Sequence, residues 1–319
     1  MTLMLSGYTL MISHIRSVQR DDLNIILDRQ PDIRAYLFDL PDLGAATLTI
    51  SDKQMSLLQS RRKQRIQQYC TTELQQTIRE QPQQAWSAIH DHKNRLLFCS
   101  IRRCASSAWK QYLLYLNKRI DDSSIKVEHS QVLQDPNLEI LYRDGVKRLT
   151  DANTAVSFLF VRDPWIRLVS AYLATVRHSD YALKTHAPCS WYRTKQGKSP
   201  TFREFVICII TESQKKGVAK LDDYWKPQYL FCSLCYINYK HIGHMETITA
   251  DFNYIMKMAG RNSTDSTLSN LSTRSAPEVP AMVAKQYYLT LSRKTVIQLQ
   301  KLYRPDYELH GYRPLPPGW

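Results

Sequence analysis

The segment Val156–Val176, VSFLFVRDPWIRLVSAYLATV, constrains the fold of this chain more than any other stretch. VSFLFV is a short apolar run of β-branched and aromatic residues, which is typical of a buried strand. Asp163 can cap a following helix, and Pro164 suits the first turn of that helix. Apolar residues then recur at helical spacing: Trp165, Leu168, Val169, Tyr172 and Val176. The pattern predicts a strand that turns directly into an amphipathic helix, as in an open α/β sheet.

Arg162 stands at the carboxyl end of this predicted strand, beside the N-terminus of the predicted helix. Ligands of open α/β sheets bind at this edge, and helix N-termini favour anions. Arg167 and Ser170 are three residues apart and therefore share a helix face. We predict a phosphate site here. The alternative is an ordinary strand–helix unit with a solvated arginine.

A second strand–loop–helix pattern lies upstream at Arg95–Leu116, RLLFCSIRRCASSAWKQYLLYL. LLFCSI is typical of a strand, RRCASSA of a polar loop and WKQYLLYL of a helix. At such a junction, backbone N–H groups and the helix dipole can hold a phosphate or sulfate. Hydroxyl groups or positive charge would come from Ser106, Ser107, Arg102, Arg103 and Lys110. Taken alone, the loop could equally be an exposed basic turn.

The downstream pattern RDPxxRLxSAY resembles the 3′-phosphate-binding motif of Golgi carbohydrate sulfotransferases, which use 3′-phosphoadenosine 5′-phosphosulfate (PAPS). Within them it is most similar to the group that contains the chondroitin and dermatan 4-O-sulfotransferases. This resemblance implies that Arg162 and Ser170 hold the 3′-phosphate of PAPS. It also implies that the upstream loop binds the same cofactor, through Arg102, Arg103, Cys104, Ala105, Ser106, Ser107, Ala108, Trp109 and Lys110.

The upstream loop departs from the family pattern C-x-V-P-K-V-x-C-T-N-W-K, although Cys99, Trp109 and Lys110 keep their spacing. Arg102 stands in place of Pro, and Arg103 in place of Lys. By the resemblance, that Lys stabilises the bridging oxygen as the sulfuryl group leaves. Arginine keeps the charge, but it is a planar fork and cannot give up a proton. The sequence thus leaves open a PAPS-dependent carbohydrate sulfotransferase or a degenerate homologue that only binds glycans.

Further resemblance extends the match to roughly residues 90–315. The similar stretches are Phe202–Val206, Asp223–Gly260 and Leu302–Tyr312. The implied fold class is α/β: a P-loop-like sulfotransferase fold with a central parallel sheet flanked by helices. We expect residues 1–89 to form a divergent N-terminal or stem region and residues 90–319 the sulfotransferase domain.

Other segments are assigned from pattern alone. Ser56–Ile89 is rich in Gln, Arg and Glu and is predicted to be helical, with RRKQR at 61–65 as a solvated basic face. Residues 201–260 are predicted to supply a helix, a strand and a helix, and Val283–Leu302 a terminal helix. Arg177–Pro200 is predicted to be a long polar loop near the substrate cleft.

Sulfuryl transfer needs an acceptor hydroxyl, a base near it and positive charge on the leaving phosphate. Arg103 and Lys110 are the predicted catalytic cations, and no metal is required because fixed cations perform that role. His129 is the predicted base, with Asp223, Glu128 and Glu246 as alternatives. Tyr224 stands where the family has a histidine. The absence of G-x-x-x-x-G-K-[ST] argues against a P-loop kinase.

The charge of the chain favours polyanionic partners. Lys and Arg number 43 against 29 Asp and Glu, a formal net charge of +14. No recognised DNA- or RNA-binding motif is present, so we expect an acidic glycan acceptor, either a glycosaminoglycan or an N-glycan, and no nucleic acid. Trp191, Tyr192 and Arg193 could line its cleft or belong to a solvated surface loop.

The seven cysteines are too few for a disulfide-built scaffold, and their odd number leaves at least one unpaired in a monomer. Cys232 and Cys235, with His241 and His244, form a zinc-like spacing on paper. The stretch is rich in Tyr and Ile and favours a strand instead. The resemblance makes the Cys232/Cys235 pair structural and disulfide-bonded.

A membrane anchor is implied by the resemblance, but it is not evident in this chain. Met1–Ile15 is partly apolar and shorter than the ~18–20 residues that span a bilayer, and it lacks a basic n-region. We expect a truncated form or an incomplete gene model of a Golgi membrane protein whose domain is lumenal. Asn262 and Asn270 begin glycosylation sequons in a polar loop at 261–280, which fits a lumenal location.

Overall fold

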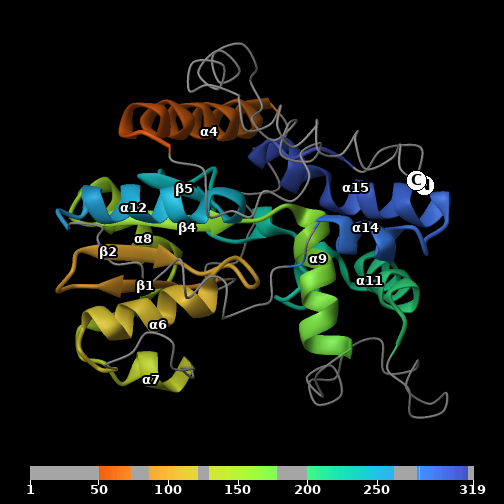
Figure 1. The fold of residues 1–319 in the computed structure, drawn as a ribbon, viewed down its shortest axis with the longest axis horizontal. Coiled ribbons are helices and arrows are strands. Elements are labelled where there is room, and N and C mark those ends of the chain that lie inside the picture. Colours follow the sequence, from red (N-terminus) through yellow and green to blue (C-terminus); the bar gives the residue numbers. More distant parts are fainter. Residues whose placement is uncertain are drawn as a thin grey trace, which may run out of the picture. The chain divides into compact units, whose positions relative to one another are not determined.

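The computed structural model describes residues 50–72, 86–120, 129–177, 200–261, 279 and 281–314. At its centre is a five-stranded sheet with the order β3-β1-β2-β4-β5 (Figure 1). The strands are β1 (Ala88–Asp91), β2 (Leu96–Cys99), β3 (Leu138–Leu141), β4 (Val156–Val161) and β5 (His241–His244). The chain therefore has the α/β architecture that the sequence predicted.

The sheet is mixed, whereas the sequence led us to expect a parallel one. Strands β2, β4 and β5 are parallel, as predicted. Strand β1 pairs antiparallel with both β2 and β3, so the wholly parallel prediction is wrong at this edge. The reason is the connection between β1 and β2: residues 92–95 form a turn, and parallel neighbours need a crossover of a dozen or more residues.

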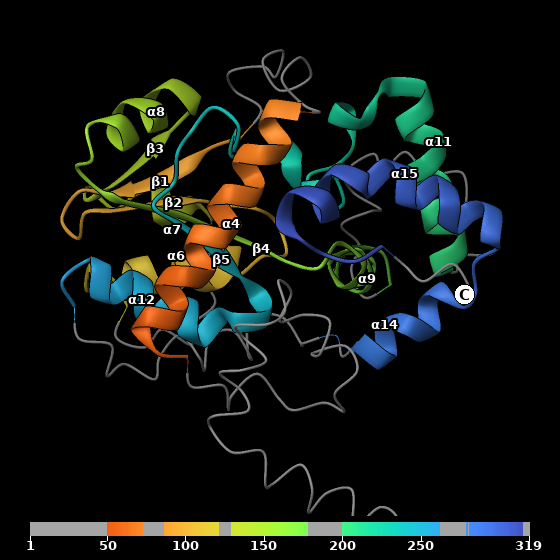
Figure 2. The ribbon, with the colours of Figure 1, turned by 90° about the horizontal axis from the view of Figure 1, so that it is seen from above.

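Helices cover both faces of the sheet, and a further group of helices packs beside one end of its strands. They are α4 (Asp52–Thr72), α6 (Ser106–Leu116), α7 (His129–Leu133), α8 (Arg143–Asp151), α9 (Pro164–Tyr172), α11 (Phe202–Lys216), α12 (Ile248–Met258), α14 (Ala281–Tyr288) and α15 (Arg293–His310). Helices α6 and α12 lie on one face of the sheet, and α8 lies on the other (Figure 2). Helices α9, α11, α14 and α15 gather beside the carboxyl end of β4 (Figures 1 and 2).

An aromatic cluster joins the sheet to its helical cover. Trp109 of α6 is fully buried and lies 4.4 Å from the Phe158 ring of β4 and 5.5 Å from the Phe252 ring of α12, centroid to centroid. Phe98 of β2 stacks on Phe158, its register partner, at 5.3 Å. Aromatic pairs at these separations add to the stabilisation that burial alone gives.

The unit predicted at Val156–Val176 is confirmed. Asp163 caps α9 by accepting from the backbone N–H groups of Trp165 (2.8 Å) and Ile166 (3.0 Å), and Pro164 opens the helix. The predicted apolar face is buried along its length. The helix, strand and helix predicted in 201–260 are α11, β5 and α12.

Two local predictions are wrong. The predicted terminal helix is two helices, α14 and α15, because the chain turns at 289–292 and Ser292 caps α15 by accepting from Thr295 N. The strand predicted around Cys232 and Cys235 is a turn in which Cys232 has φ 63°. Both errors have one cause, since apolar periodicity does not reveal where a short turn interrupts it.

The helix predicted over Ser56–Ile89 is confirmed as α4 up to Thr72, but Ala88 and Ile89 lie in strand β1. The solvated interpretation of the basic stretch is wrong for Arg62. Arg62 is 8% exposed, and its Nη1 lies 2.7 Å from Asp251 Oδ1. Gln59, one turn earlier, is also buried and donates to Ile242 O (3.0 Å) and Asp251 Oδ1 (3.1 Å). This buried helix face can be polar because Asp251 and the β5 backbone accept its hydrogen bonds.

Disulfides connect distant parts of the chain. Cys99 of β2 bonds Cys232, and Cys70 of α4 bonds Cys235. Both Cys232 and Cys235 are thus structural and disulfide-bonded, as the resemblance implied, and each bonds a cysteine far away in the sequence. The zinc alternative is excluded because neither sulfur is a free thiolate. Cys104 is a free, buried thiol, as the odd count led us to expect of at least one cysteine.

Some predictions lie outside the described residues. These are the Met1–Ile15 segment, nearly all of the 177–200 loop with Trp191, Tyr192 and Arg193, and the sequons at Asn262 and Asn270. Among the helices that are described, none is both long and apolar enough to cross a lipid bilayer.

Candidate functional site

The two motifs meet at one edge of the sheet. Strands β2 and β4 are parallel neighbours, with Cys99 opposite Leu159, so their carboxyl ends lie side by side. The loop 100–105 leaves β2 at this edge and leads into α6, while Arg162 leaves β4 and leads into α9. The sheet thus brings together the two segments that the sequence predicted as one site.

Two arginines converge on one buried hydroxyl. Arg103 donates to Ser170 Oγ from Nε (3.0 Å) and from Nη2 (2.5 Å), and Arg162 Nη1 lies 3.4 Å from the same oxygen. Ser170 is fully buried and Arg162 is 6% exposed. Burial and, to a smaller extent, the nearby Arg162 charge together lower the pKa of Arg103 to about 10. A guanidinium that has lost solvent beside a like charge is stabilised by an anion.

The two guanidiniums have no carboxylate to neutralise them in the part of the chain that the structure describes. The arginine ion pairs there involve other arginines: Arg62, Arg119, Arg143 and Arg304. A buried cation (Arg162) beside a partly buried one (Arg103), without a counter-ion, is costly unless a ligand supplies the negative charge. This arrangement is suited to a phosphate or sulfate group.

The backbone of the loop adds donors to this edge. Arg103 (φ 68°) and Ala105 (φ 57°) both have left-handed backbones, which are uncommon outside glycine and are held by the surrounding structure. Helix α6 begins at Ser106, and no described side chain caps it. The N–H groups of its first turn remain as anion donors. Ser107 is exposed at this turn, so its hydroxyl is accessible.

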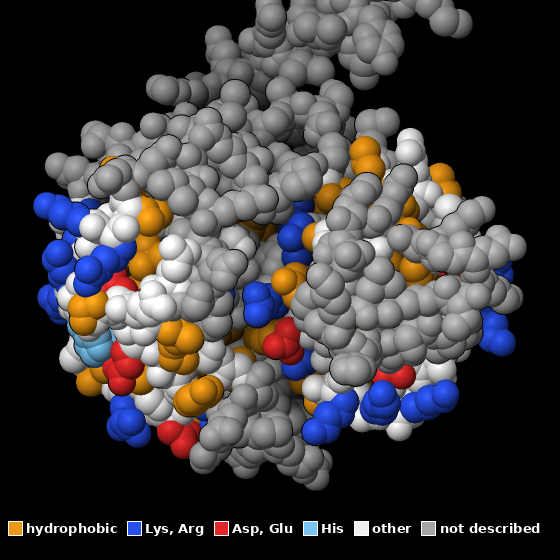
Figure 3. Space-filling view, turned by 90° about the horizontal axis from the view of Figure 1, so that it is seen from below, with side chains coloured by type: hydrophobic (Ala, Val, Ile, Leu, Met, Phe, Trp, Pro, Cys, Tyr) orange, Lys and Arg blue, Asp and Glu red, His pale blue; other side chains and the backbone are white. Residues whose placement is uncertain are grey.

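Lys110 lies one turn into α6 and is 9% exposed. The lysine ion pairs of the described ranges involve Lys147, Lys216, Lys226 and Lys257, not Lys110. Burial and, to a smaller extent, the Arg102 charge together lower the pKa of Lys110 to about 8. Arg102 itself stacks over the Tyr224 ring, with its Cζ 5.4 Å from the centroid. Lys and Arg side chains, with acidic and apolar ones among them, line the hollow near the middle of the face seen in Figure 3.

The Gln228 side chain connects the two motifs through hydrogen bonds to Cys104 and to the backbone of Arg162. Its Oε1 accepts from Arg162 N (2.9 Å) and from Cys104 Sγ (3.2 Å), and its Nε2 donates to Arg162 O (2.7 Å). The backbone N–H groups of Gln228 and Tyr229 donate to Asp306 at 2.7 and 2.8 Å. Burial raises the pKa of Asp306 to about 6, against the lowering effect of these hydrogen bonds. No role was predicted for Gln228 or Asp306 from the sequence, although they lie in the similar stretches Asp223–Gly260 and Leu302–Tyr312.

The Arg167 side chain binds backbone carbonyl groups of the loop and of a neighbouring segment. It is 1% exposed and donates to Arg102 O (2.9 Å), Lys226 O (2.8 Å) and Asp223 O (3.2 Å). The sequence predicted that Arg167 and Ser170 share one helix face, but in the structure they make different contacts. The Ser170 hydroxyl accepts hydrogen bonds from Arg103 and Arg162, whereas Arg167 binds backbone carbonyls of the loop after β2 and of residues 223–226.

Several predicted site residues are not at the surface of this edge. The side chains of Cys104, Ala108 and Trp109 are fully buried, so any contact of theirs with a nucleotide would use backbone atoms. His129 begins α7, but its side chain lies outside the described atoms, and Glu128 lies outside the described ranges. The cofactor and catalytic assignments of these residues stay predictions.

The alternative bases already have protein partners. Asp223 pairs with Lys226 at 2.6 Å. Glu246 accepts from Asp163 N (2.8 Å) and from the Tyr312 hydroxyl (3.0 Å). These bonds compete with the role of proton acceptor at either position, and His129 remains the predicted base.

Comparison with known proteins gives consistent matches. Carbohydrate sulfotransferase 9 of Homo sapiens is 27% identical over 235 residues, covering 70% of this chain and 52% of that protein. Carbohydrate sulfotransferase 11 of Danio rerio is 26% identical over 238 residues, covering 70% and 66%. Carbohydrate sulfotransferase 10 of Rattus norvegicus is 28% identical over 246 residues, covering 69% and 65%. The chain thus spans about half to two thirds of the length of these relatives.

No solved structure matches the chain. A sequence model of the Sulfotransferase family matches residues 86–313, which include β1, both predicted nucleotide motifs and the Gln228–Asp306 contact. On this match, the chain belongs to the Sulfotransferase family.

Proposed function

We propose that this protein transfers a sulfuryl group from PAPS to a hydroxyl of a glycan. The observation that carries the proposal is the convergence of Arg103 and Arg162 on Ser170 without a carboxylate partner among the described residues. Relatives that are named carbohydrate sulfotransferases support the choice of a sugar acceptor.

Each group has a defined task in this proposal. Arg162 and Ser170 bind the 3′-phosphate of PAPS, and the N–H groups at the start of α6 bind the phosphosulfate. Arg103 and Lys110 stabilise the charge that develops on the leaving 5′-phosphate. The acceptor oxygen forms a bond to sulfur, the bond from sulfur to the bridging phosphate oxygen breaks, and His129 takes the hydroxyl proton.

The acceptor we propose is a GalNAc of a chondroitin- or dermatan-type glycosaminoglycan. The net charge of +14 supports a polyanionic acceptor, because such a surface attracts it at long range. We place the protein on the lumenal side of the Golgi membrane. The Cys70–Cys235 and Cys99–Cys232 disulfides support an oxidising compartment.

A second candidate is a homologue that binds glycans without transferring sulfate. Arg103 favours it, since this side chain replaces the family's lysine and is bonded to Ser170. A guanidinium spreads its charge over a fork and cannot give up a proton, so it is a poor substitute where a compact donor is needed.

A transfer assay separates the two candidates. Labelled PAPS is incubated with the protein and with desulfated chondroitin, desulfated dermatan or an N-glycan that ends in GalNAc. Transfer to one acceptor that is lost in Arg103→Ala supports the enzyme. Saturable binding of the same glycans with no transfer by the wild-type protein would reject it and support the binding protein.

A further inference from the structure

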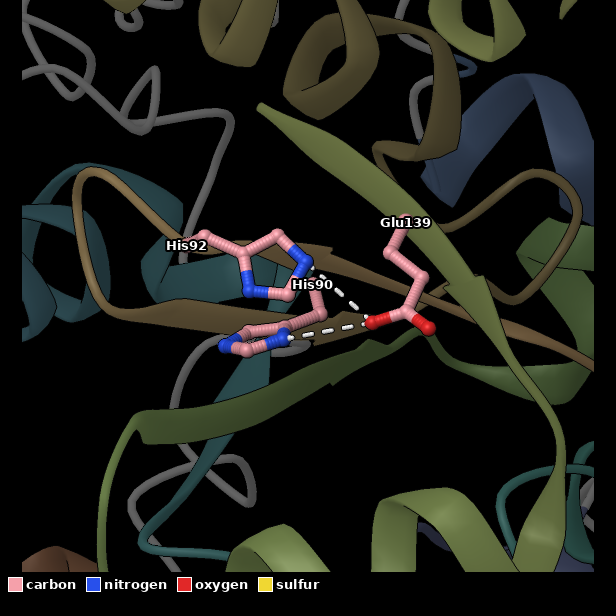
Figure 4. A group of neighbouring side chains, drawn as sticks. All are labelled: His90, His92 and Glu139. Carbon is pink, nitrogen blue, oxygen red and sulfur yellow. Dashed lines mark ion pairs between the residues drawn. The ribbon is translucent and has the colours of Figure 1, made fainter. Parts of the chain in front are cut away.

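A cluster of two histidines and a glutamate lies outside the nucleotide motifs. His92 Nε2 is 3.2 Å from Glu139 Oε2, and His90 Nδ1 is 3.9 Å from the same oxygen. The three potential ligand atoms all lie within 4.8 Å of one another. Both imidazoles are directed at the one carboxylate (Figure 4).

Backbone hydrogen bonds hold all three residues. His90 and Glu139 are direct register partners in the antiparallel pair β1–β3. His92 is the first residue of the turn after β1, and its N–H donates to Asn137 O at 3.0 Å, next to β3. Its imidazole lies on the same side as the His90 imidazole and the Glu139 carboxylate (Figure 4). The side chains therefore converge from a rigid support, which a precise binding site needs.

His90 gives an independent sign that a ligand is missing. The residue is 8% exposed, and among the described residues its Nδ1 has no hydrogen-bond partner. The nearest carboxylate oxygen is 3.9 Å away, which is too far for a hydrogen bond. A buried ring nitrogen without a partner is costly, and this one is aimed at the space between His92 and Glu139.

We propose that His90 Nδ1, His92 Nε2 and Glu139 Oε2 bind one divalent zinc ion. Imidazole nitrogen and carboxylate oxygen are ordinary zinc ligands, with bonds of about 2.0–2.2 Å. Ligand atoms on one tetrahedral ion then lie roughly 3.4 Å apart, as follows from that bond length. The two distances to Glu139, 3.2 and 3.9 Å, bracket this value, so small side-chain movements suffice.

The position of the cluster indicates a structural task. It lies toward the end of the sheet where β2 begins, whereas the loop 100–105 leaves β2 at its other end. A bound ion would clamp the edge strand β3 onto β1. Side chains of His92 and Glu139 are 51% and 50% exposed, so an ion can enter from solvent and keep a water as its fourth ligand. The site is independent of sulfate transfer.

The test is a zinc titration by calorimetry on the full chain, without a histidine tag and after removal of metal by a chelator. We expect one ion per chain, and at least about tenfold weaker binding in both His92→Ala and Glu139→Gln. These two residues are half exposed, so their variants should fold. Asp151→Asn removes a similarly exposed carboxylate from α8 and should bind zinc as the wild type does.

Thermal unfolding supplies a second readout. Zinc should raise the unfolding midpoint of the wild-type protein and of Asp151→Asn, and not of Glu139→Gln, because a ligand of the native state alone stabilises it. Three results would overturn the site: no saturable binding, a stoichiometry other than one, or equal affinity in His92→Ala, Glu139→Gln and the wild type. The last of these would identify adventitious binding to other surface histidines.

Discussion

Arg103 and Ser170 are 67 positions apart, and the arginine donates to the serine hydroxyl from both Nε and Nη2. The bond joins the loop after β2 to the helix after β4. It holds the residue that replaces the family's lysine beside the proposed 3′-phosphate site, so the proposed task of Arg103 at the leaving 5′-phosphate requires both phosphates of the nucleotide to lie within reach of this side chain. A ligand phosphate at Ser170 would therefore contact both motifs through one side chain.

The first prediction concerns Arg103. Arg103→Ala should lower sulfate transfer by about 10²–10³-fold, the cost of removing one electrostatic stabiliser of a transition state. Arg103→Lys should preserve or raise turnover because it restores a compact ammonium. Initial rates with labelled PAPS measure both. Arg148→Ala removes an exposed arginine from α8 and should keep the wild-type rate. Full transfer by Arg103→Ala would show that the loop does not act as proposed.

The second prediction uses the pKa of Lys110, which burial lowers to about 8. A bound anion favours the charged form, so binding of 3′-phosphoadenosine 5′-phosphate should raise this pKa and take up protons near pH 8. Affinity should fall as the pH rises from 7 to 9. Calorimetry in buffers of different ionisation enthalpy measures the uptake. Lys110→Met should bind with no uptake from this group, and unchanged proton uptake in that variant would remove Lys110 from the site.

The third prediction concerns the attachment of α4. Removing Arg62 leaves Asp251 fully buried without its ion-pair partner, so Arg62→Ala should lower the free energy of unfolding by about 3–5 kcal/mol. Denaturant unfolding measures this loss. Lys53→Ala removes an exposed positive charge from the same helix and should change stability by less than about 0.5 kcal/mol. Similar, small losses in both variants would mean that α4 contributes little to the fold.

The fourth prediction concerns Asp306, whose folded-state pKa is raised to about 6 from an ordinary value of 3.8. Between these values the folded state binds more protons than the unfolded state, so this residue's contribution to stability grows as the pH falls from 7 to 4. Relative to Asp306→Asn, the wild type should gain up to about 3 kcal/mol over that range. Denaturant unfolding at each pH measures the difference. A gap that stays constant with pH would contradict the raised pKa.

Local sequence patterns predicted the parts of the fold that local chemistry decides. Asp163 and Pro164 marked the start of α9, and the structure has this cap in place. The parallel neighbours β2 and β4 followed from two strand–loop–helix patterns in succession. The meeting of Arg103, Arg162 and Ser170 could be predicted in outline, because parallel strands bring their carboxyl ends together.

Long-range pairing could not be predicted in the same way. Cys99 and Cys232 are separated by 133 positions, and spacing alone does not determine which cysteines bond. The buried face of α4 was not predicted because polar residues such as Gln59 and Arg62 are normally expected to face solvent. Their partner Asp251 lies far away in the sequence. Gln228 escaped for a similar reason: its role depends on backbone atoms of Arg162, which carry no sequence signal.

The central claim is that the two motifs form one site for a 3′-phosphorylated nucleotide, and calorimetry of Arg162→Ala tests it most directly. The ligands are 3′-phosphoadenosine 5′-phosphate and adenosine 5′-phosphate, which differ only in the 3′-phosphate. We predict that the variant loses ~1.5–3 kcal/mol of affinity for the first ligand and almost none for the second. Unchanged affinity for both ligands in the folded variant, or an equal loss for both, would contradict the claim.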